Sequence, residues 1–165
     1  MSVSFEFRLE GPADSPLIEV LHADLFGPER DKRAAYVLRE GVPRDPALSF
    51  VATHEGRLAA SVRMTPITIG GRPALLLGPL AVVPEQKGRG AGKALVRKAL
   101  DAARAGGHHV VMLVGDLPYY GPLGFTFLGR DVITLPAWVD RDRVLVACLT
   151  EGALIGLGGA AEKVR

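Results

Sequence analysis

The sequence predicts a mixed α+β fold in which a central, mostly antiparallel sheet of roughly six or seven strands is flanked by about four helices. Three observations predict it. Apolar side chains alternate along residues 3–9, strand-like segments separated by glycine turns fill residues 48–83, and a strand–helix–strand pattern spans residues 74–114. With 165 residues, of which 48% are hydrophobic, the chain suits a single domain covering residues 1–165.

Composition excludes several classes of protein. The one cysteine, Cys148, allows no intrachain disulfide, metal-ligand spacing is absent, and a reducing cytoplasm is therefore expected, with no metal. The N-terminus lacks the pattern of a signal peptide, and no apolar stretch approaches the roughly 18 residues of a membrane span. The net charge is only +2 and aromatic residues make up 6%, so neither a membrane nor nucleic acid is an expected partner.

The first third of the chain reads as one strand followed by two helices. Val3 to Leu9 places apolar side chains on one face, and Asp14 or Ser15 can cap a helix whose apolar residues recur at helical spacing as far as Phe26. A second, more polar helix is expected from residue 29 to about residue 40. His22 sits among apolar neighbours and is expected to be a buried structural histidine with its hydrogen bonds satisfied, with a substrate contact as the alternative.

A change to strand patterns begins at residue 48. An antiparallel meander is expected, with turns at residues 55–57 and 70–73. Its fourth strand, residues 74–83, is apolar but interrupted by Gly78–Pro79, which predicts a bulge because proline cannot donate to a strand ladder. A helix with a small apolar face then leads to a parallel strand at 110–114, and final strands are expected at 132–135 and 144–149.

The loop between the fourth strand and this helix predicts a phosphate site. Residues 84–98 carry five basic residues against one acid, and a helix N-terminus offers unpaired amides that attract an anion. The spacing fits neither known phosphate loop, because Lys93 stands where a dinucleotide loop needs glycine and Ala94 stands where a P-loop needs a hydroxyl. A glycine-rich turn with solvated basic side chains is the alternative reading.

A second informative stretch runs from Asp116 to Phe127. Pro118 can open a short helix that contains Tyr119 and Tyr120, and Tyr120 precedes Gly124 by four residues. A packed turn is the alternative reading of these paired tyrosines.

Together the two stretches resemble the signatures of the GNAT superfamily of N-acyltransferases. Lys87, Gly90 and Gly92 take the positions of (Gln/Arg)-x-x-Gly-x-(Gly/Ala), with Lys87 departing from the usual residue, and Tyr120 begins the Tyr-x-x-x-Gly-Phe pattern. The motifs GPLAV and GDxxYYxxxGF are similar to those of one uncharacterised bacterial branch of that superfamily. The resemblance implies the GNAT fold, with the sheet splayed between its fourth and fifth strands, and acetyl-CoA as co-substrate.

The resemblance also implies roles for particular residues. Tyr120 is the expected catalytic acid, since a phenol of pKa near 10 can protonate a departing thiolate. Backbone groups near Leu80 and Val82 are expected to bind the pantetheine arm. The expected cofactor-binding residues are Leu80, Ala81, Val82, Lys87, Gly88, Arg89, Gly90, Ala91, Gly92, Lys93, Asp116 and Tyr119.

The implied activity is N-acetyl transfer by direct attack of a primary amine on acetyl-CoA. The acceptor is expected to be a small molecule or peptide bound over the paired helices, with a homodimer left open. The fourth strand offers no acid or histidine as general base, which leaves Asp116, His54, Glu55 or a water molecule. Trp138 either covers the active site or simply packs. A non-catalytic acetyl-CoA sensor is the alternative function.

Overall fold

The computed structural model describes residues 4–164, so Val3, the first residue of the expected N-terminal strand, lies outside the described residues. The strands are β1 Glu6–Leu9, β2 Phe50–His54, β3 Arg57–Ile69, β4 Arg72–Val82, β5 Val110–Val114, β6 Phe125–Thr126, β7 Ile133–Thr134, β8 Val144–Cys148 and β9 Gly159–Lys163. The helices are α1 Ser15–Phe26, α2 Ala34–Arg39, α3 Ala91–Ala105 and α4 Leu117–Tyr120. No helix within residues 4–164 is long and apolar enough to cross a membrane.

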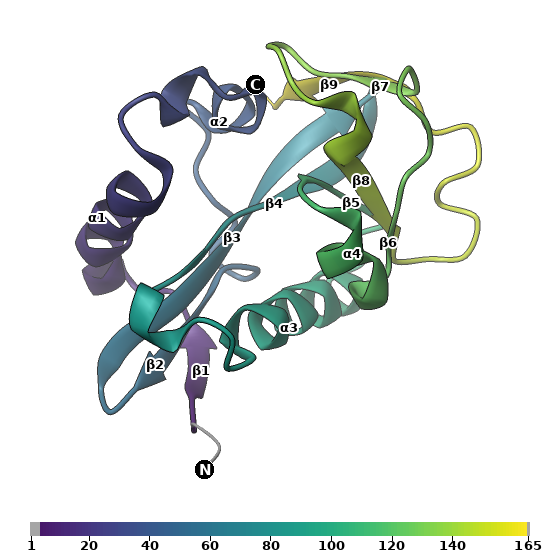
Figure 1. Cartoon of the computed structure of the whole chain (residues 1–165). Coiled ribbons are helices and arrows are strands. Elements are labelled where there is room, and N and C mark those ends of the chain that lie inside the picture. The colour runs from purple at the N-terminus through teal and green to yellow at the C-terminus, as the bar shows by residue number, and fades with distance from the viewer. Residues whose placement is uncertain (1–3, 165) are drawn as a thin grey trace.

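These strands form one mixed sheet whose main order is β1-β2-β3-β4-β5-β8-β6 (Figure 1). Neighbouring strands from β1 to β4 pair antiparallel, and only β4 and β5 pair parallel along this path. The parallel pair is joined by α3, as the strand–helix–strand pattern predicted. β9 adds to the far half of β3, and β7 pairs with β9.

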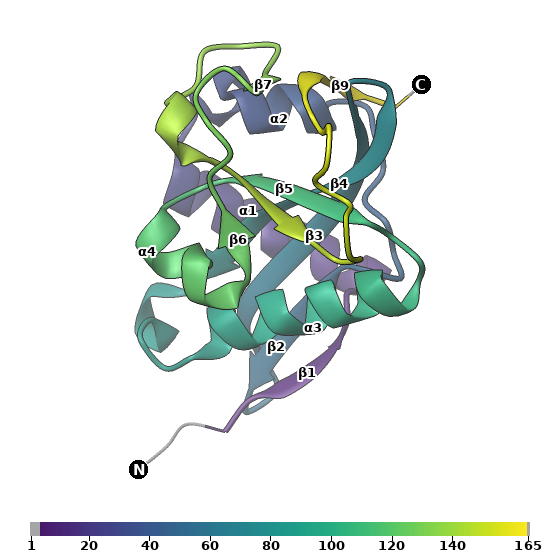
Figure 2. The ribbon, with the colours of Figure 1, turned by 90° about the vertical axis from the view of Figure 1, so that its right-hand side faces the viewer.

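Helices cover both faces of the sheet. Figure 2 shows α3 in front of the strands, with α1 and α2 behind them. Successive residues of β4 point to opposite faces, so Leu75 and Leu77 join the core under α3, whereas Leu76 joins the core that contains Leu38 of α2. The two apolar cores therefore hold the helical layers against the middle strands.

Small residues bring α3 close to the sheet. Ala91, Leu95, Ala99 and Ala103 are almost fully buried at helical spacing. Charged side chains occupy the exposed side of the same helix, as expected. They are Lys93, Arg97, Asp101 and Arg104.

The interruption of β4 at Gly78–Pro79 is a bulge, as predicted. Val62 of β3 faces Leu80 and Met64 faces Leu77, so two residues of β4 oppose the single residue Arg63. Gly78 has a φ of 125°, and the Gly78–Pro79 peptide bond is cis. The bulge changes the course of β4 just before its last residues.

Beyond that point β4 and β5 separate. Their parallel ladder contains only the pairs Leu75–Val111 and Leu76–Met112. From Leu77 to Val82, β4 has no strand partner on its β5 side within the described chain. The sheet is thus splayed between its fourth and fifth strands, and backbone groups of β4 are left for another partner.

Several local expectations were wrong. Leu9 was expected on the apolar face with Phe5 and Phe7, but it is 48% exposed because it ends an edge strand that pairs only with β2. The expected helix over residues 29–40 is a 3-10 turn, Arg30–Lys32, followed by the shorter α2, because Arg33 between them is extended. Strand β9 was not predicted from the sequence.

Candidate active site

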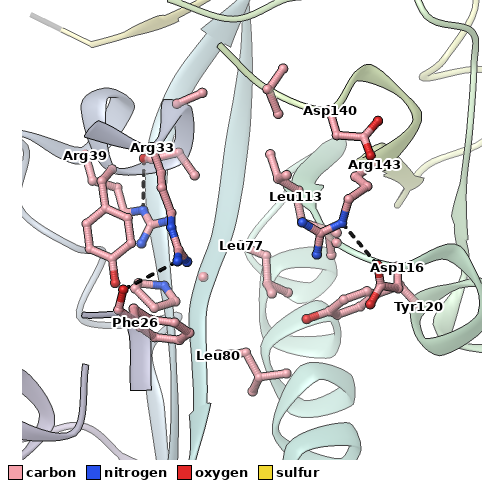
Figure 3. A pocket seen from close by; sticks show the side chains of 18 of the residues that line it. Phe26, Arg33, Arg39, Leu77, Leu80, Leu113, Asp116, Tyr120, Asp140 and Arg143 are labelled. Carbon is pink, nitrogen blue, oxygen red and sulfur yellow. Dashed lines mark hydrogen bonds and ion pairs between the residues drawn. The ribbon is translucent and has the colours of Figure 1, made fainter. Parts of the chain in front are cut away.

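The separation of β4 and β5 opens a cavity of about 1110 Å³. One wall comes from the α1–α2 region, one from β4 around the bulge, and one from the end of β5 with α4 and the segment before β8 (Figure 3). The cavity therefore reaches from the segment after β4 to the helices α1 and α2. Its polar lining residues are Glu29, Lys32, Arg33, Tyr36, Arg39, Lys87, Asp116, Tyr119, Tyr120, Asp140 and Arg143.

The loop that leads from β4 into α3 presents free backbone amides. A 3-10 turn at Pro84–Gln86 is followed by Gly88 and Gly90, whose φ angles are 76° and 91°. Within the described chain the amides of residues 88–93 donate to no backbone carbonyl, and Ala94 is the first amide to bond back, to Gly90 at 3.1 Å. Such a row of amides at a helix N-terminus can bind a phosphate.

Basic side chains surround these amides. Lys87, Arg89, Lys93 and Arg97 are all exposed, so their charges face solvent beside the loop. The ammonium of Lys93 lies 5.3 Å from the centre of the Tyr119 ring. Of the expected loop residues, only Lys87 also lines the cavity.

Three of the expected cofactor-binding residues are buried. They are Ala81, Ala91 and Gly92, so these positions can offer a ligand their backbone only. A Cβ on Gly92 would lie 2.9 Å from the Tyr119 hydroxyl and 3.3 Å from a methyl of Val82. Glycine is therefore needed at position 92 for the close approach of α3 to β4 and Tyr119.

Tyr120 is held rigidly in the cavity wall. Its ring lies against Gly115, where an added Cβ would come within 2.5 Å of the ring, and 5.8 Å from the centre of the Phe125 ring. Figure 3 shows Tyr120 beside Asp116 at the β5 side of the cavity. Burial, followed by the nearby Tyr119 and Asp116, raises the pKa of Tyr120 to about 12, so the phenol remains protonated at neutral pH.

Tyr119 and Asp116 are the neighbours of Tyr120 in and before α4. The Tyr119 ring makes an edge contact with Tyr120, with centres 4.8 Å apart, while its hydroxyl lies next to the start of α3. Asp116 begins α4 by accepting the amides of Tyr119 and Tyr120 at its carbonyl. Its carboxylate accepts a hydrogen bond of 3.0 Å from Nε of Arg143, so Asp116 is already paired with a cation.

The candidate general bases do not all come together. His54 and Glu55 lie at the turn between β2 and β3, and neither lines a cavity with Tyr120. Nδ1 of His54 instead contacts the carbonyl of Ser4 at 3.0 Å. Asp116 alone of the named side chains shares the cavity with Tyr120.

A second cavity, of about 820 Å³, adjoins the first and is lined by residues of α1, α2 and β3. It shares Tyr36, Arg39 and Pro79 with the first cavity, so these residues form the wall between the two. Acceptor binding was expected over this helical region, but neither Tyr36 nor Arg39 was singled out. Their three-residue spacing on one helix was the available signal, since it places both side chains on the same side of α2.

His22 lines the second cavity and is 2% exposed. It is buried as expected, but the expectation that its hydrogen bonds are satisfied was wrong, because Nε2 has no hydrogen-bond partner among residues 4–164. Burial, followed by the charge of Arg63, lowers the pKa of His22 to about 4. The imidazole is therefore neutral at physiological pH.

This burial predicts a loss of stability in mild acid. The folded-state pKa of His22 lies below its unfolded value near 6.5, so the unfolded chain binds the extra proton as the pH falls through 6.5 toward 4. The free energy of unfolding is expected to fall by roughly 3 kcal/mol more in the natural chain than in His22→Gln between pH 7 and pH 4. Urea unfolding of both proteins at each pH measures this, and parallel losses would refute it.

Other single residues lie apart from the site. Trp138 is 86% exposed at the rim of the large cavity, so it neither covers the interior nor packs into the core, and both expectations for it were wrong. Cys148 is exposed on β8, where its thiol donates to the carbonyl of Thr150. No group of three or more histidine, cysteine, aspartate or glutamate residues in the described range could hold a metal ion.

Comparison with known proteins gives a consistent result. A family profile described as the acetyltransferase (GNAT) family matches residues 16–125. The uncharacterised N-acetyltransferase YjhQ of Escherichia coli strain K12 is 31% identical over 125 residues, which cover 73% of this chain and 69% of that protein.

Solved structures match as well. The GNAT family N-acetyltransferase YhbS from Escherichia coli, in complex with CoA, superposes with a TM-score of 0.82 at 27% identity, covering 99% of this chain and 92% of that chain. A GNAT family acetyltransferase from Brucella melitensis, in complex with acetyl-CoA, gives 0.60 at 27% identity, covering 84% and 97%. With the profile spanning most of the sheet and the splayed strands in place, the chain belongs to the acetyltransferase (GNAT) family.

Proposed function

We propose that this protein is an N-acetyltransferase that transfers the acetyl group of acetyl-CoA directly to a primary amine. One observation carries the proposal: the unpaired edge of β4 leads from the cavity that Tyr120 lines to Lys87 and the row of free amides that follows it. Two solved relatives of similar fold contain CoA or acetyl-CoA, which supports the choice of co-substrate.

The chain can hold acetyl-CoA in a defined orientation. The amides of residues 88–93 and the surrounding basic side chains bind the phosphates, and the unpaired β4 edge from Leu80 to Val82 hydrogen-bonds the pantetheine arm. Acetyl-CoA supplies an activated acetyl group at the end of that arm. The amine nitrogen forms the new bond to the acetyl carbon as the carbon–sulfur bond breaks, and Tyr120, whose pKa of about 12 keeps it protonated at neutral pH, gives its proton to the leaving sulfur. The proton that the attacking nitrogen releases restores the phenol, so one proton passes overall from nitrogen to sulfur.

The cavity lining supports direct attack. Among the described residues that line it there is no serine, threonine, cysteine or histidine, the side chains whose hydroxyl, thiol or imidazole would most readily accept the acetyl group first. The acceptor amine enters from the side of α1 and α2, so both substrates occupy one cavity together. Proximity and orientation then replace a covalent intermediate.

The attraction of the phosphates to the loop gives a prediction about salt. The dissociation constant of acetyl-CoA is expected to rise roughly 3- to 10-fold between low and high ionic strength, because exposed charges are screened by salt. Arg89→Gln should weaken both the affinity and its salt dependence. Lys98→Gln is the matched control. It also removes one positive charge, but Lys98 lies over the ring of Phe7, away from the loop. Calorimetric titration showing no salt dependence would exclude binding of the phosphates at this loop.

The direct test of function is release of the CoA thiol from acetyl-CoA in the presence of a broad panel of primary amines. We expect thiol release that depends on the amine, with an equal amount of acetylated amine formed. Tight acetyl-CoA binding with no turnover on any amine would instead favour a sensor. One observation favours this second function. Asp116 is the one expected general base in the cavity, and its carboxylate is already paired with Arg143.

A further inference from the structure

Three buried polar atoms near α2 lack any hydrogen-bond partner within residues 4–164. They are Nε2 of His22, the hydroxyl of Tyr36 and Nη1 of Arg39. All three residues line the second cavity, and Tyr36 and Arg39 line the large one as well. Because an unpaired buried donor costs free energy, such a cluster indicates groups that a ligand completes.

Arg39 is the charged member of this cluster. Its Nε donates to the carbonyl of Ala35 at 3.2 Å, and its guanidinium lies 4.6 Å from the centre of the Tyr36 ring. Within the described residues no carboxylate lies within ion-pair distance of Arg39, whereas Arg63 beside it pairs with Glu10 and Glu19. Arg39 is therefore a half-buried cation whose Nη1 is fully buried and which has no anion beside it among the described residues.

The charge of Arg39 persists in the pH range of any assay. Burial, opposed in part by Tyr36 and reinforced by the charge of Arg63, lowers the pKa of Arg39 to about 10, which is still well above neutral pH. The acids that line the second cavity with it, Glu19, Asp31 and Glu40, make no ion pair with it. An anion that enters from solvent thus meets a protonated guanidinium at neutral pH.

The position of Arg39 relates it to the site of transfer. Its Nη2 lies 3.8 Å from the place that a Cβ on Gly78 would occupy, directly beside the β4 bulge. Figure 3 shows Arg39 and Arg33 on one side of the cavity, across from Tyr120 and Arg143 on the other. A small molecule held by Arg39 would therefore extend toward the opening between β4 and β5.

We propose that Arg39, assisted by the hydroxyl of Tyr36, binds an anionic group, a carboxylate or a phosphate, on the acceptor and so directs its amine toward the acetyl group. The inference rests on the proposed acetyltransferase function. The planar fork of arginine matches the oxygen geometry of both anions, and the tyrosine hydroxyl supplies one further donor. The natural acceptor is then an amino acid or an amino phosphate, and a simple alkylamine is a poor substrate.

Matched acceptors test this inference. We expect kcat/KM for β-alanine or for phosphoethanolamine to exceed that for n-propylamine by about 10- to 100-fold, because hydrogen bonds to a buried charge are strong. Which of the two anionic amines is preferred distinguishes carboxylate from phosphate. Equal kcat/KM values for all three amines would overturn the inference while leaving the transferase function intact.

Substitutions in the cavity wall identify the side chain that causes the preference for anionic amines. Arg39→Gln is expected to reduce the ratio of kcat/KM for the preferred anionic amine to kcat/KM for n-propylamine to within about 3-fold of one, mainly through a higher KM for the anionic amine. Arg33→Gln is the matched control, since it removes the same charge from an exposed side chain in the same wall. If Arg39→Gln keeps the ratio, or Arg33→Gln abolishes it equally, the inference is wrong. Should Arg39→Gln fail to fold, Tyr36→Phe must lower the ratio by roughly 3- to 10-fold instead.

Calorimetry in the presence of CoA separates this inference from the proposed function. N-acetyl-β-alanine or N-acetylphosphoethanolamine is expected to bind at least about 10-fold more tightly than N-propylacetamide, and Arg39→Gln should remove the difference. If that pattern appears without turnover of any amine, the anion site stands and the transferase function fails. If neither turnover nor selective binding appears, both are wrong.

Discussion

Tyr120→Phe is expected to lower kcat and kcat/KM together by about 10²–10⁴ while leaving the affinity for acetyl-CoA nearly unchanged. The substitution keeps the ring, whose contacts with Gly115 and Phe125 fix its position, and removes only the hydroxyl proton. An interaction that forms chiefly as the sulfur departs stabilises the transition state, so its loss appears in the rate and not in binding. Steady-state kinetics with calorimetric titration of acetyl-CoA measure both quantities.

Tyr119→Phe is the internal control for this result. Its hydroxyl lies beside Gly92 at the start of α3, and its ring shares the edge contact with Tyr120. We expect the Tyr119 variant to keep most of its turnover. Full turnover in Tyr120→Phe would show that Tyr120 is not the proton donor. A loss of turnover in Tyr119→Phe at the same time would identify Tyr119 as the donor instead.

Gly90→Val is expected to weaken acetyl-CoA binding by roughly 5- to 30-fold while the domain remains folded. Gly90 precedes α3 with a φ of 91°, a conformation that costs a side-chain-bearing residue about 1–2 kcal/mol. The free loop can relax out of this conformation, and binding must then restore it, so the strain appears as lost affinity. Calorimetric titration of acetyl-CoA measures the change.

Gly107→Val is the matched control. Gly107 lies just beyond the other end of α3 with a φ of 83°, and at both positions an added Cβ meets no atom within 4 Å. The two substitutions therefore introduce similar strain, but only Gly90 belongs to the loop with free amides. We expect Gly107→Val to lose stability and keep its affinity. Equal losses of affinity in both variants would show that strain in α3, and not the loop, determines binding. Gly92 is unsuited to this test because a Cβ there would collide with Tyr119.

Much of the fold could be predicted because its signals are local. Val110–Val114 forms β5 as expected, since five consecutive apolar residues between glycine-rich segments fit a buried strand. The bulge at Gly78–Pro79 was predictable because a proline in the middle of an apolar strand cannot complete the ladder. The loop before α3 and the tyrosine pair of α4 could be placed near each other because they follow neighbouring strands.

The parts that were not predicted depend on distant contacts. β9 has the sequence GAAEK, which carries no strand pattern, and it is ordered through pairing with Ile67–Ile69 nearly a hundred residues earlier. Leu9 follows a correct alternation, but no neighbouring element covers it. The environment of Arg39 is set by the packing of α2 beside the β4 bulge, and one sequence gives no sign that this arginine, among many, lacks an anion.

If acetyl-CoA and the acceptor occupy one cavity together and react directly, catalysis passes through a ternary complex. Initial rates measured with both substrates varied reveal whether such a complex forms. We expect double-reciprocal lines that intersect, as a ternary complex requires, with no acetylated protein detected by intact mass when acetyl-CoA is added alone. Parallel lines together with an acetylated protein would contradict direct transfer, because they would show that the chain itself accepts the acetyl group before the amine does.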